Sequence, residues 1–227
     1  MNGAAGHRCA TVGSVERPIE PLTRSSLAAA VAELAGRDRD LAGIVTRFGH
    51  PPLWDREPGF GTLLHIVLEQ QVSLASARAA FDRLTTAAHP LTPTRFLALS
   101  DPELLAIGFS RQKARYGRAL AEALETGALD LDAVATLDDA AAARELEAIP
   151  GIGPWTSTIY LLMVLGRPDV WPSGDIALAA AVGEVIGLDH RPASDEMAAI
   201  GERWRPWRSV AARLFWHDYL ARRGRSG

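Results

Sequence analysis

The chain has 227 residues, of which 48% are hydrophobic and 22% are charged, and its formal net charge is −3. This composition is typical of a globular protein with one substantial core, or with two small lobes that share one. The single cysteine, Cys9, excludes an intrachain disulfide framework, a multi-cysteine zinc site and an iron–sulfur cluster held by four cysteines.

Two features indicate that the chain is neither secreted nor embedded in a membrane. The N-terminal segment lacks a basic run followed by an apolar stretch, so we expect no secretory signal. The longest apolar run, Ile159–Leu165, is far too short to span a bilayer. We therefore expect a cytoplasmic protein without a membrane partner.

The charges are unevenly distributed. An acidic chain is not the usual composition for nucleic-acid binding, but the segment 202–227 holds seven arginines against two acids. These arginines form either an ordinary solvated surface or a basic patch for an anionic partner. They are Arg203, Arg205, Arg208, Arg213, Arg222, Arg223 and Arg225.

Helical patterns begin near residue 25. Residues 1–20 show no helical period and are expected to form an N-terminal tail. Apolar residues then recur at helical spacing in two stretches, Leu27–Leu34 and Leu41–Phe48. Three prolines and a glycine interrupt the chain between residues 50 and 59.

The rest of the chain is predicted to be helical as well. Apolar periodicity, N-cap residues and stop signals define the segments 60–71, 74–84, a short helix from Ser100, 111–125, 137–149, 155–165, 176–186, 195–204 and 209–222. No stretch shows sustained strand alternation. The pattern predicts an all-α protein of roughly ten helices joined by short loops.

The sequence Pro150-Gly151-Ile152-Gly153-Pro154 predicts a tight hairpin between two helices. Pro150 ends the first helix because it lacks an N–H group, and Pro154 suits the first turn of the next. The two glycines permit backbone angles that side chains forbid, and they leave little bulk above the second helix. The hairpin is either an ordinary helix–helix turn or a site where a phosphate approaches a helix N-terminus.

Asp175 follows Pro172-Ser173-Gly174 and precedes an apolar helix, so it lies at or near the helix N-cap. It is either a simple cap or a functional carboxylate that the positive helix end keeps ionised. An ionised carboxylate in a water-poor pocket stabilises a developing cation.

Four segments within residues 60–222 carry a resemblance: LLHIVLEQQVSLASARAAFDRL, GFSRQKARYGRALAEAL, LEAIPGIGPWTSTIYLLMVLGRPDVWPSGDIAL and WRPWRSVAARLFWHDYL. In this order they resemble the helix-hairpin-helix (HhH-GPD) DNA glycosylase superfamily, in particular its 3-methyladenine DNA glycosylase II branch. The resemblance implies an all-α, two-lobed fold with the active site between the lobes and no substantial sheet. A single domain, 21–227, would hold one lobe from about 60–190 with the hairpin 146–165, and a second lobe from the N-terminal helices and the C-terminal helices 194–222.

The resemblance further implies a monofunctional DNA glycosylase of base excision repair, which flips a damaged base out of duplex DNA and hydrolyses its N-glycosidic bond. Breaking this bond gives the sugar oxocarbenium character, and the family's essential carboxylate falls at Asp175. Related enzymes with lyase activity carry a lysine where this chain has Trp155, and the only lysine, Lys113, lies in another motif. The resemblance thus implies no lyase activity, no required cofactor and no iron–sulfur cluster.

Trp155 and Trp216 match aromatic positions that line the family's base pocket, and Tyr160 is either a third pocket residue or a core residue. Flat aromatic faces suit a positively charged base, such as an alkylated purine. Alkylation at N3 or N7 also weakens the glycosidic bond, so a strong general acid is not required.

The implied partner is double-stranded DNA that contains a damaged base, bound by a monomer. Gln71 matches the wedge that fills the space left by the flipped base, and the hairpin and arginines would contact phosphates. A structural Na⁺ or K⁺ ion would bind backbone carbonyls of Glu147, Ile149 and Ile152. The implied DNA contacts are Gln71, Ser73, Pro150, Gly151, Ile152, Gly153, Thr156, Arg205 and Arg208.

The chain departs from the family's pattern at three places. Gly174 stands where the family usually has a first aspartate, and alanines at 179–181 stand where an arginine is common. Only about 60 residues precede the first motif, so we expect the larger N-terminal sheet domain of some members to be absent. The lesion stays open among 3-methyladenine, 7-methylguanine, ethenoadenine and hypoxanthine.

Two alternatives to an alkylpurine glycosylase stay open at this level. One is a non-catalytic module of the same fold that binds DNA damage, and the other is an all-α scaffold with a chance hairpin. A carboxylate at Asp175 beside Trp155 and Trp216 favours chemistry over binding alone.

Overall fold

The computed structural model describes residues 20–224. The predicted tail, 1–20, therefore lies almost entirely outside the described residues, as does Arg225. Within residues 20–224 the chain forms thirteen α-helices and one short 3₁₀ helix, with no strand. The prediction of an all-α fold is confirmed.

The helices follow one another with short connections. In chain order they are α1 (Arg24–Arg37), α2 (Arg39–Phe48), α3 (Phe60–Glu69), α4 (Leu74–Ala87), α5 (Pro93–Leu97), α6 (Asp101–Ile107), α7 (Arg111–Glu125), α8 (Leu131–Thr136), α9 (Asp139–Glu147), α10 (Pro154–Met163), α11 (Ile176–Ile186), α12 (Ser194–Gly201), η1 (Glu202–Trp204) and α13 (Arg208–Arg222).

Local signals place many of the helix starts. The Ser73 hydroxyl accepts a hydrogen bond from the Ser76 N–H at the start of α4, and Ser100 and Glu103 form a capping box at the start of α6. Helix α7 has the predicted bounds. Two helices, α5 and α8, were not predicted because their five and six residues are too few to show an apolar period.

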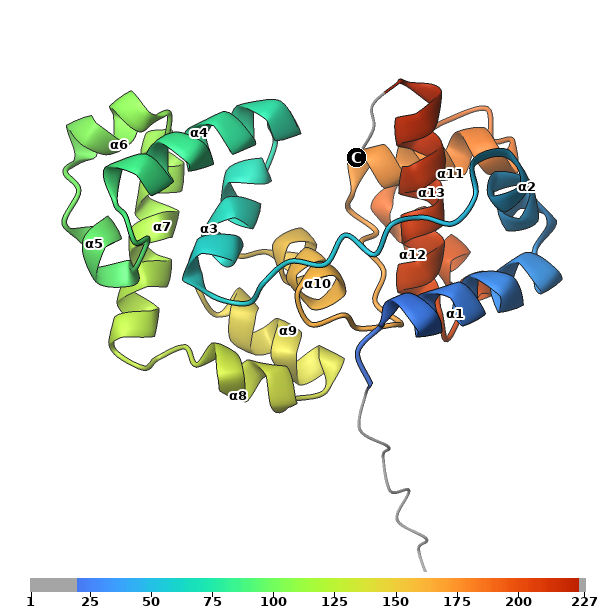
Figure 1. The fold of residues 1–227 in the computed structure, drawn as a ribbon, viewed down its shortest axis with the longest axis horizontal. Coiled ribbons are helices and arrows are strands. Elements are labelled where there is room, and N and C mark those ends of the chain that lie inside the picture. The colour runs from blue at the N-terminus through green and yellow to red at the C-terminus, as the bar shows by residue number, and fades with distance from the viewer. Residues whose placement is uncertain (1–19, 225–227) are drawn as a thin grey trace, which may run out of the picture.

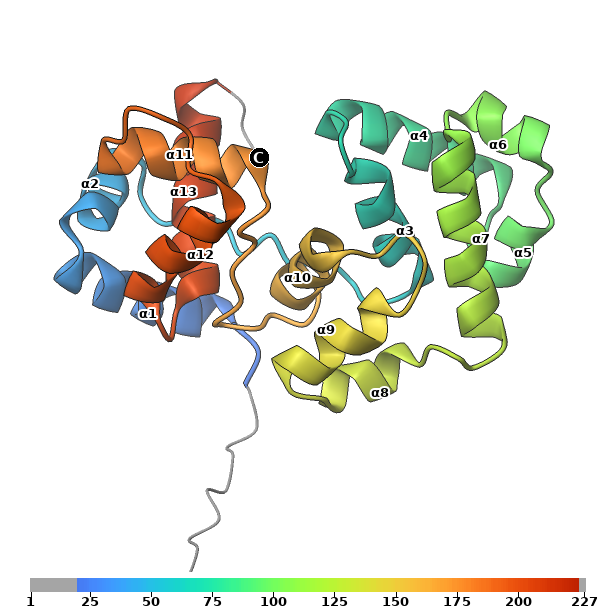
Figure 2. The same cartoon turned by 180° about the vertical axis from the view of Figure 1, so that it is seen from behind.

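Figures 1 and 2 show the helices in two groups. One group contains α3 to α7, in which α7 packs against α3, α5 and α6. The other contains α1, α2, α11, α12 and α13, in which α13 packs against α1, α2 and α11. Helices α8, α9 and α10 lie between and below the two groups in Figure 1, and α10 contacts both α3 and α9.

One boundary differs from the prediction. Helix α11 precedes residue 190, but it packs against α13, so it lies with the C-terminal helices. The apolar side that α11 buries includes Leu178, Ala181 and Val182. The chain therefore passes between the two groups in the segment 49–59 and again between α10 and α11.

A buried arginine joins these parts of the chain. The Arg213 guanidinium donates hydrogen bonds to the carbonyls of Leu53 (2.7 Å), Leu162 (2.8 Å) and Ser209 (3.1 Å). Burial lowers the pKa of Arg213 to about 10. Arg213 thus connects α13 to the end of α10 and to the segment 49–59. Among the described helices, none is long and apolar enough to cross a membrane.

Candidate active site

Asp175 is the N-cap of α11, as predicted. Its Oδ1 accepts a hydrogen bond of 2.7 Å from the backbone N–H of Leu178. A pair of turns leads into this position, because Ser173 N donates to Trp171 O and Asp175 N donates to Pro172 O, both at 2.9 Å. The carboxylate therefore sits on a short, hydrogen-bonded loop at the positive end of a helix.

Two tryptophans from different helices donate to the same carboxylate. The indole Nε1 of Trp155, in the first turn of α10, lies 2.9 Å from Asp175 Oδ2. The indole Nε1 of Trp216, on α13, lies 3.2 Å from Asp175 Oδ1. Each carboxylate oxygen accepts about two hydrogen bonds, so Oδ1 is filled by Leu178 and Trp216. The remaining accepting capacity lies on Oδ2.

The carboxylate and its two indole partners are partly shielded from solvent. Asp175 and Trp155 are half-buried and Trp216 is buried. Ile176, directly after Asp175, leaves 66% of its surface exposed. The structure thus brings Asp175, Trp155 and Trp216 together, as the resemblance implies, and adds that the indoles contact the carboxylate through their N–H edges.

Tyr160 does not join this group. Its side chain is fully buried in the core, and burial raises the pKa of its phenol to about 12. On helix α10, Tyr160 is five positions after Trp155, so the two side chains leave the helix in very different directions. Of the two interpretations that the sequence leaves open, the structure supports the core residue and not the pocket residue.

The two hairpin glycines have different roles. Gly151 has φ +93°, and a Cβ atom there would lie only 2.1 Å from Cγ of Tyr116 on α7. Position 151 therefore requires glycine for two reasons: its backbone is left-handed, and the Tyr116 ring leaves no room for a side chain. Gly153 has φ −107° and open space where a Cβ atom would lie, so its backbone does not require glycine.

The start of α10 presents several backbone donors. Within the hairpin, Ile152 N donates to Ile149 O and Ser157 N donates to Gly153 O. Among the hydrogen bonds within residues 20–224, the N–H groups of Gly153, Trp155 and Thr156 have no partner. These donors form the kind of surface that binds a phosphate.

The hairpin side chains are placed differently from one another. Pro150 is exposed, whereas Ile152 is buried and packs in the core. The Thr156 side chain is also buried, so it cannot contact DNA as implied by the resemblance. Only the backbone N–H of Thr156 is available for that role.

The Gln70 side chain holds the hairpin through two hydrogen bonds. Its Nε2 donates to Gly151 O and to Thr156 Oγ1, both at 2.8 Å. The sequence motif pointed to Gln71 and gave no role to Gln70. Two consecutive glutamines carry no local signal for which one points inward, so only the packed structure distinguishes them.

Gln71 is exposed and adopts φ +57°, a left-handed conformation that is uncommon for a residue with a side chain. Such a conformation costs roughly 1 kcal/mol and often marks functional sites. Its neighbours Val72 and Leu74 leave 46% and 63% of their surfaces exposed. Ser73 is exposed, and its hydroxyl is used to cap α4. The turn thus projects Gln71 outward with apolar side chains beside it.

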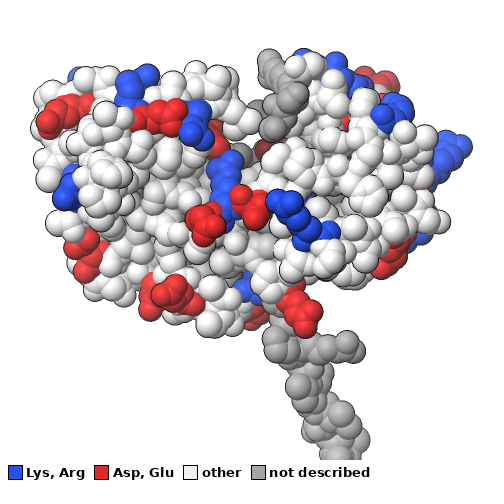
Figure 3. Space-filling model, viewed as in Figure 1, with Lys and Arg blue, Asp and Glu red and all other residues white. Residues whose placement is uncertain are grey.

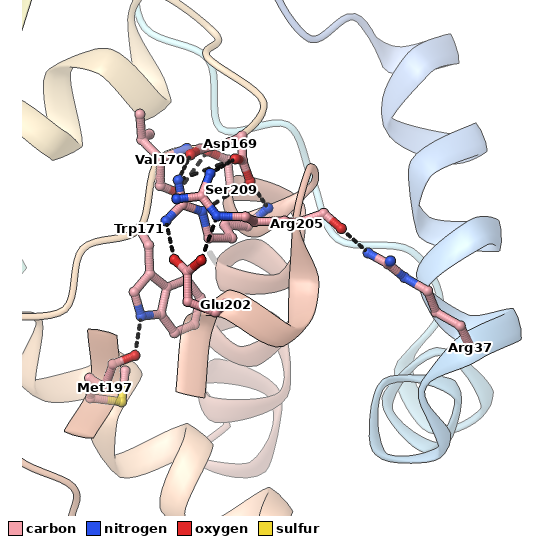
Figure 4. Close-up of polar contacts among 9 residues, drawn as sticks. Arg37, Asp169, Val170, Trp171, Met197, Glu202, Arg205 and Ser209 are labelled. Carbon is pink, nitrogen blue, oxygen red and sulfur yellow. Dashed lines mark hydrogen bonds and ion pairs between the residues drawn. The ribbon is translucent and has the colours of Figure 1, made fainter. Parts of the chain in front are cut away.

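Arg205 and Arg208, for which the resemblance implies phosphate contacts, are both paired with acids of this chain. The Arg208 guanidinium lies 3.0 Å from both Asp169 Oδ1 and Glu202 Oε1. Arg205 lies 2.8 Å from Asp169 Oδ2 and 2.6 Å from Glu202 Oε2. Figure 4 shows Asp169 and Glu202 close to Arg205, whose carbonyl accepts a hydrogen bond from Arg37. Both arginines are already neutralised by these partners.

Lys113 lies on α7 and donates to the backbone carbonyl of Leu68 near the end of α3. Partial burial lowers the pKa of Lys113. Its amine is thus held at the helix end that leads into Gln70 and Gln71, and none of its hydrogen bonds involves the hairpin or Asp175.

A cavity of about 460 Å³ lies elsewhere, between α1 and the segment 50–55. Arg24, Leu27 and Ala28 line one side of it. Neither Asp175 nor the two tryptophans that contact it line this cavity, so it is separate from the candidate site.

The face seen in Figure 3 carries no broad patch of one charge. Basic and acidic side chains alternate across it, and most of the surface is uncharged. This distribution fits the net charge of −3 and does not by itself favour an anionic partner on that face.

Comparisons with known proteins identify relatives of this arrangement. The model of the HhH-GPD superfamily of base excision DNA repair proteins matches residues 64–206. YfjP of Bacillus subtilis (strain 168), provisionally named a DNA-3-methyladenine glycosylase, is 30% identical over 70% of this chain. A Mycobacterium tuberculosis protein, named a probable bifunctional transcriptional activator/DNA repair enzyme AlkA, is 32% identical over 82% of this chain. The chain spans 58% and 39% of these two relatives' lengths.

Solved structures show the same fold. A Bacillus halodurans DNA-3-methyladenine glycosidase is 26% identical with a TM-score of 0.71, over 86% of this chain and 91% of that chain. The Schizosaccharomyces pombe 3-methyladenine DNA glycosylase Mag1, solved with abasic DNA, is 24% identical with a TM-score of 0.74, over 83% of this chain and 95% of that chain. At this identity, the similarity to Mag1 concerns the fold alone.

Proposed function

Since the chain belongs to the HhH-GPD superfamily of base excision DNA repair proteins, as the four motifs predict, we propose that it is a monofunctional DNA glycosylase for alkylated purines in duplex DNA. The lesions would be of the 3-methyladenine and 7-methylguanine type, which the names of its relatives support. The observation that carries the proposal is the Asp175 carboxylate, held at a helix N-terminus by the indole N–H groups of Trp155 and Trp216.

The reaction follows from this arrangement. The damaged nucleotide leaves the stack, and its cationic base rests near the tryptophans. As the bond from C1′ to the base nitrogen breaks, the base leaves as a neutral molecule and the sugar becomes cationic. The Asp175 carboxylate stabilises that charge, with its free accepting capacity on Oδ2. Water then adds to C1′ and gives up a proton to the surrounding water, which leaves an abasic sugar.

The DNA would be held by neutral groups more than by cations. The N–H groups of Gly153, Trp155 and Thr156 suit a phosphate of the damaged strand, and Gln71 would fill the space left by the base. Affinity should still fall with added salt, because each arginine that neutralises a phosphate releases counterions from the DNA. We further propose that the protein acts as a monomer in the cytoplasm.

The residues of the hairpin fit a monovalent cation. Among the described residues, no hydrogen bond to the carbonyls of Glu147 or Ile152 is present, and Ile149 O accepts only that of Ile152 N. These oxygens keep lone pairs that Na⁺ or K⁺ could use, and oxygen is the ligand such hard cations prefer. A bound cation would stabilise the hairpin backbone.

The decisive experiment uses a panel of duplexes, each with one lesion, followed by alkali cleavage of the abasic product. The wild-type protein should release at least one alkylated purine. Asp175→Asn should lower the rate of release by about a thousandfold, while affinity for a duplex with an abasic analogue stays close to wild type. Unchanged turnover in Asp175→Asn would exclude the proposed role of this carboxylate.

The same panel separates the alternatives. Tight binding to damaged duplex without release of any base would indicate the non-catalytic module. Failure to bind any duplex would indicate the scaffold. Borohydride treatment during turnover should trap no covalent DNA adduct, since no lysine lies in the hairpin; a trapped adduct would show lyase activity.

A further inference from the structure

The loop Gly166–Asp175 connects α10 to α11 and carries the candidate catalytic carboxylate at its end. Consecutive turns link Trp171, Pro172 and Ser173 to Asp175 through hydrogen bonds of 2.9 Å. The position of the carboxylate therefore depends on where the first half of this loop is held.

Ser209, in the first turn of α13, holds the first half of this loop through hydrogen bonds to its backbone. Ser209 Oγ donates to Val170 O at 3.0 Å and accepts from Val170 N at 3.1 Å. Ser209 N donates to Pro168 O at 3.1 Å. Ser209 is fully buried, so water cannot replace these bonds easily.

An ion pair next to this contact holds the same stretch of chain. Arg208 donates to both carboxylate oxygens of Asp169 and to its backbone carbonyl, and Arg208 N also donates to Asp169 Oδ1. The two side chains are only 17% and 20% exposed. A bidentate pair at this level of burial fixes geometry more strongly than a surface pair.

A third contact holds the loop on its other side. The Trp171 indole donates to Met197 O at 2.8 Å, a contact that Figure 4 shows together with Val170 and Ser209. Its ring lies so close to Gly201 that a Cβ there would be 2.7 Å away. The loop is thus fixed against α12 and α13 within a few residues of Asp175.

We propose that Asp169, Arg208 and Ser209 are positioning residues for Asp175, and that Arg208 serves this role rather than binding a DNA phosphate. The proposal rests on the proposed function, because it assigns how the catalytic carboxylate is placed. An oriented carboxylate does not have to reorganise as the sugar becomes cationic, and small misplacements are costly to the rate.

The test compares three variants with one control. Asp169→Asn and Arg208→Lys keep the shape or the charge but break the bidentate pair, and Ser209→Ala removes the loop contact. Glu202→Gln is the matched control, because Glu202 pairs with the same Arg208 but is not part of the loop. Single-turnover rates of base release, duplex affinity and its salt dependence are measured for each protein.

We expect Asp169→Asn, Arg208→Lys and Ser209→Ala to release the base about tenfold more slowly or worse. Duplex affinity and the slope of affinity against salt should stay at wild-type values, and Glu202→Gln should match wild type throughout. Arg208→Met, a further variant measured in the same assays, tests the alternative. A phosphate role for Arg208 predicts the reverse: Arg208→Lys would keep the rate, and Arg208→Met would weaken binding and lower the salt slope by about one. That pattern would overturn the proposal.

A readout independent of activity separates this inference from the proposed function. Amide hydrogen exchange across residues 166–178 should accelerate in Asp169→Asn and not in Glu202→Gln. If the wild-type protein releases no base, the proposed function fails, while the exchange data still report whether the loop is held as inferred. Equal exchange in wild type and Asp169→Asn would overturn the inference even if the enzyme is active.

Discussion

At the residue scale, each tryptophan of the candidate site offers two surfaces, a flat ring face and an N–H edge. The family resemblance implied a role only for the ring faces of Trp155 and Trp216, as walls of a pocket for a cationic base. In the structure both N–H edges are turned to Asp175. The two uses are compatible, because a ring whose edge is fixed by a hydrogen bond still has its face available.

Replacing either tryptophan by phenylalanine separates these uses. Trp155→Phe and Trp216→Phe keep an aromatic face but remove one N–H donor from the carboxylate. A hydrogen bond to a charged acceptor contributes about 1.5–3 kcal/mol, and water replaces part of it, so we expect base release to slow by about tenfold. Single-turnover assays measure the rate. Trp207→Phe, whose indole donates to Glu33 instead, should match wild type.

Tyr160 gives a prediction that depends on pH. The folded chain, in which the pKa is about 12, holds the phenolic proton more tightly than the unfolded chain, where tyrosine ionises near 10. The resulting stability is fully present below about pH 10 and is lost as the pH rises through about 12. Wild type should therefore lose roughly 1 kcal/mol by pH 11 that Tyr160→Phe does not lose.

Urea unfolding at pH 8 and pH 11 measures this difference. Tyr160→Phe should also release bases at the wild-type rate, because its side chain lies in the core. Slower base release by Tyr160→Phe, with an unchanged free energy of unfolding, would indicate that Tyr160 lines the base pocket.

At the scale of elements, the hairpin between α9 and α10 is held by side chains from two other helices. Tyr116 of α7 covers Gly151, and Gln70 at the end of α3 binds Gly151 O and Thr156. A further bond within the hairpin joins Ser157 Oγ to Glu147 Oε1 at 2.6 Å. The phosphate-binding geometry that we propose for the hairpin therefore depends on residues of the earlier motifs.

Paired alanine substitutions test this arrangement. Gly151→Ala must accommodate a methyl group against Tyr116 and a left-handed backbone, and it should lower the free energy of unfolding by roughly 2–4 kcal/mol. Gly153→Ala, with open space at its Cβ position, should keep wild-type stability and weaken duplex binding by crowding the exposed N–H groups. Thermal unfolding and duplex titration measure both. Equal stability of the two variants would contradict the packing described for Gly151.

At the scale of the whole molecule, the arrangement of the two helix groups depends on few connections. The segment 49–59 crosses from α2 to α3, and two hydrogen bonds hold its backbone. Leu53 O accepts from the Arg213 guanidinium, and Arg56 N donates to Met163 O. Arg56 also pairs with Glu69 of α3 at 2.9 Å. These contacts connect α13, α10 and α3.

Arg213→Met tests how much of this connection depends on one side chain. Methionine fills a similar volume but leaves three carbonyls without their donor, so we expect a loss of roughly 3 kcal/mol in the free energy of unfolding. Arg213→Lys keeps a charge and should lose less. Urea unfolding at pH 7 measures both variants, and wild-type stability in Arg213→Met would show that packing alone joins these elements.

Local features of the sequence determined the longer helices, the hairpin and the position of Asp175 at a helix start. Pro150, Gly151 and Pro154 act through backbone angles, and N-cap residues such as Ser100 act within one turn, so these signals do not depend on distant neighbours. For the same reason the four motifs, which are local patterns, were enough to indicate the superfamily.

Only the tertiary structure decided what each side chain contacts. It paired Arg208 with Asp169, placed Tyr160 in the core, and turned Gln70 inward and Gln71 outward. These outcomes depend on residues far apart in the chain, such as positions 169 and 208. A helical period predicts which side of a helix is buried, but it does not specify which partner meets a polar side chain, because that partner comes from another element.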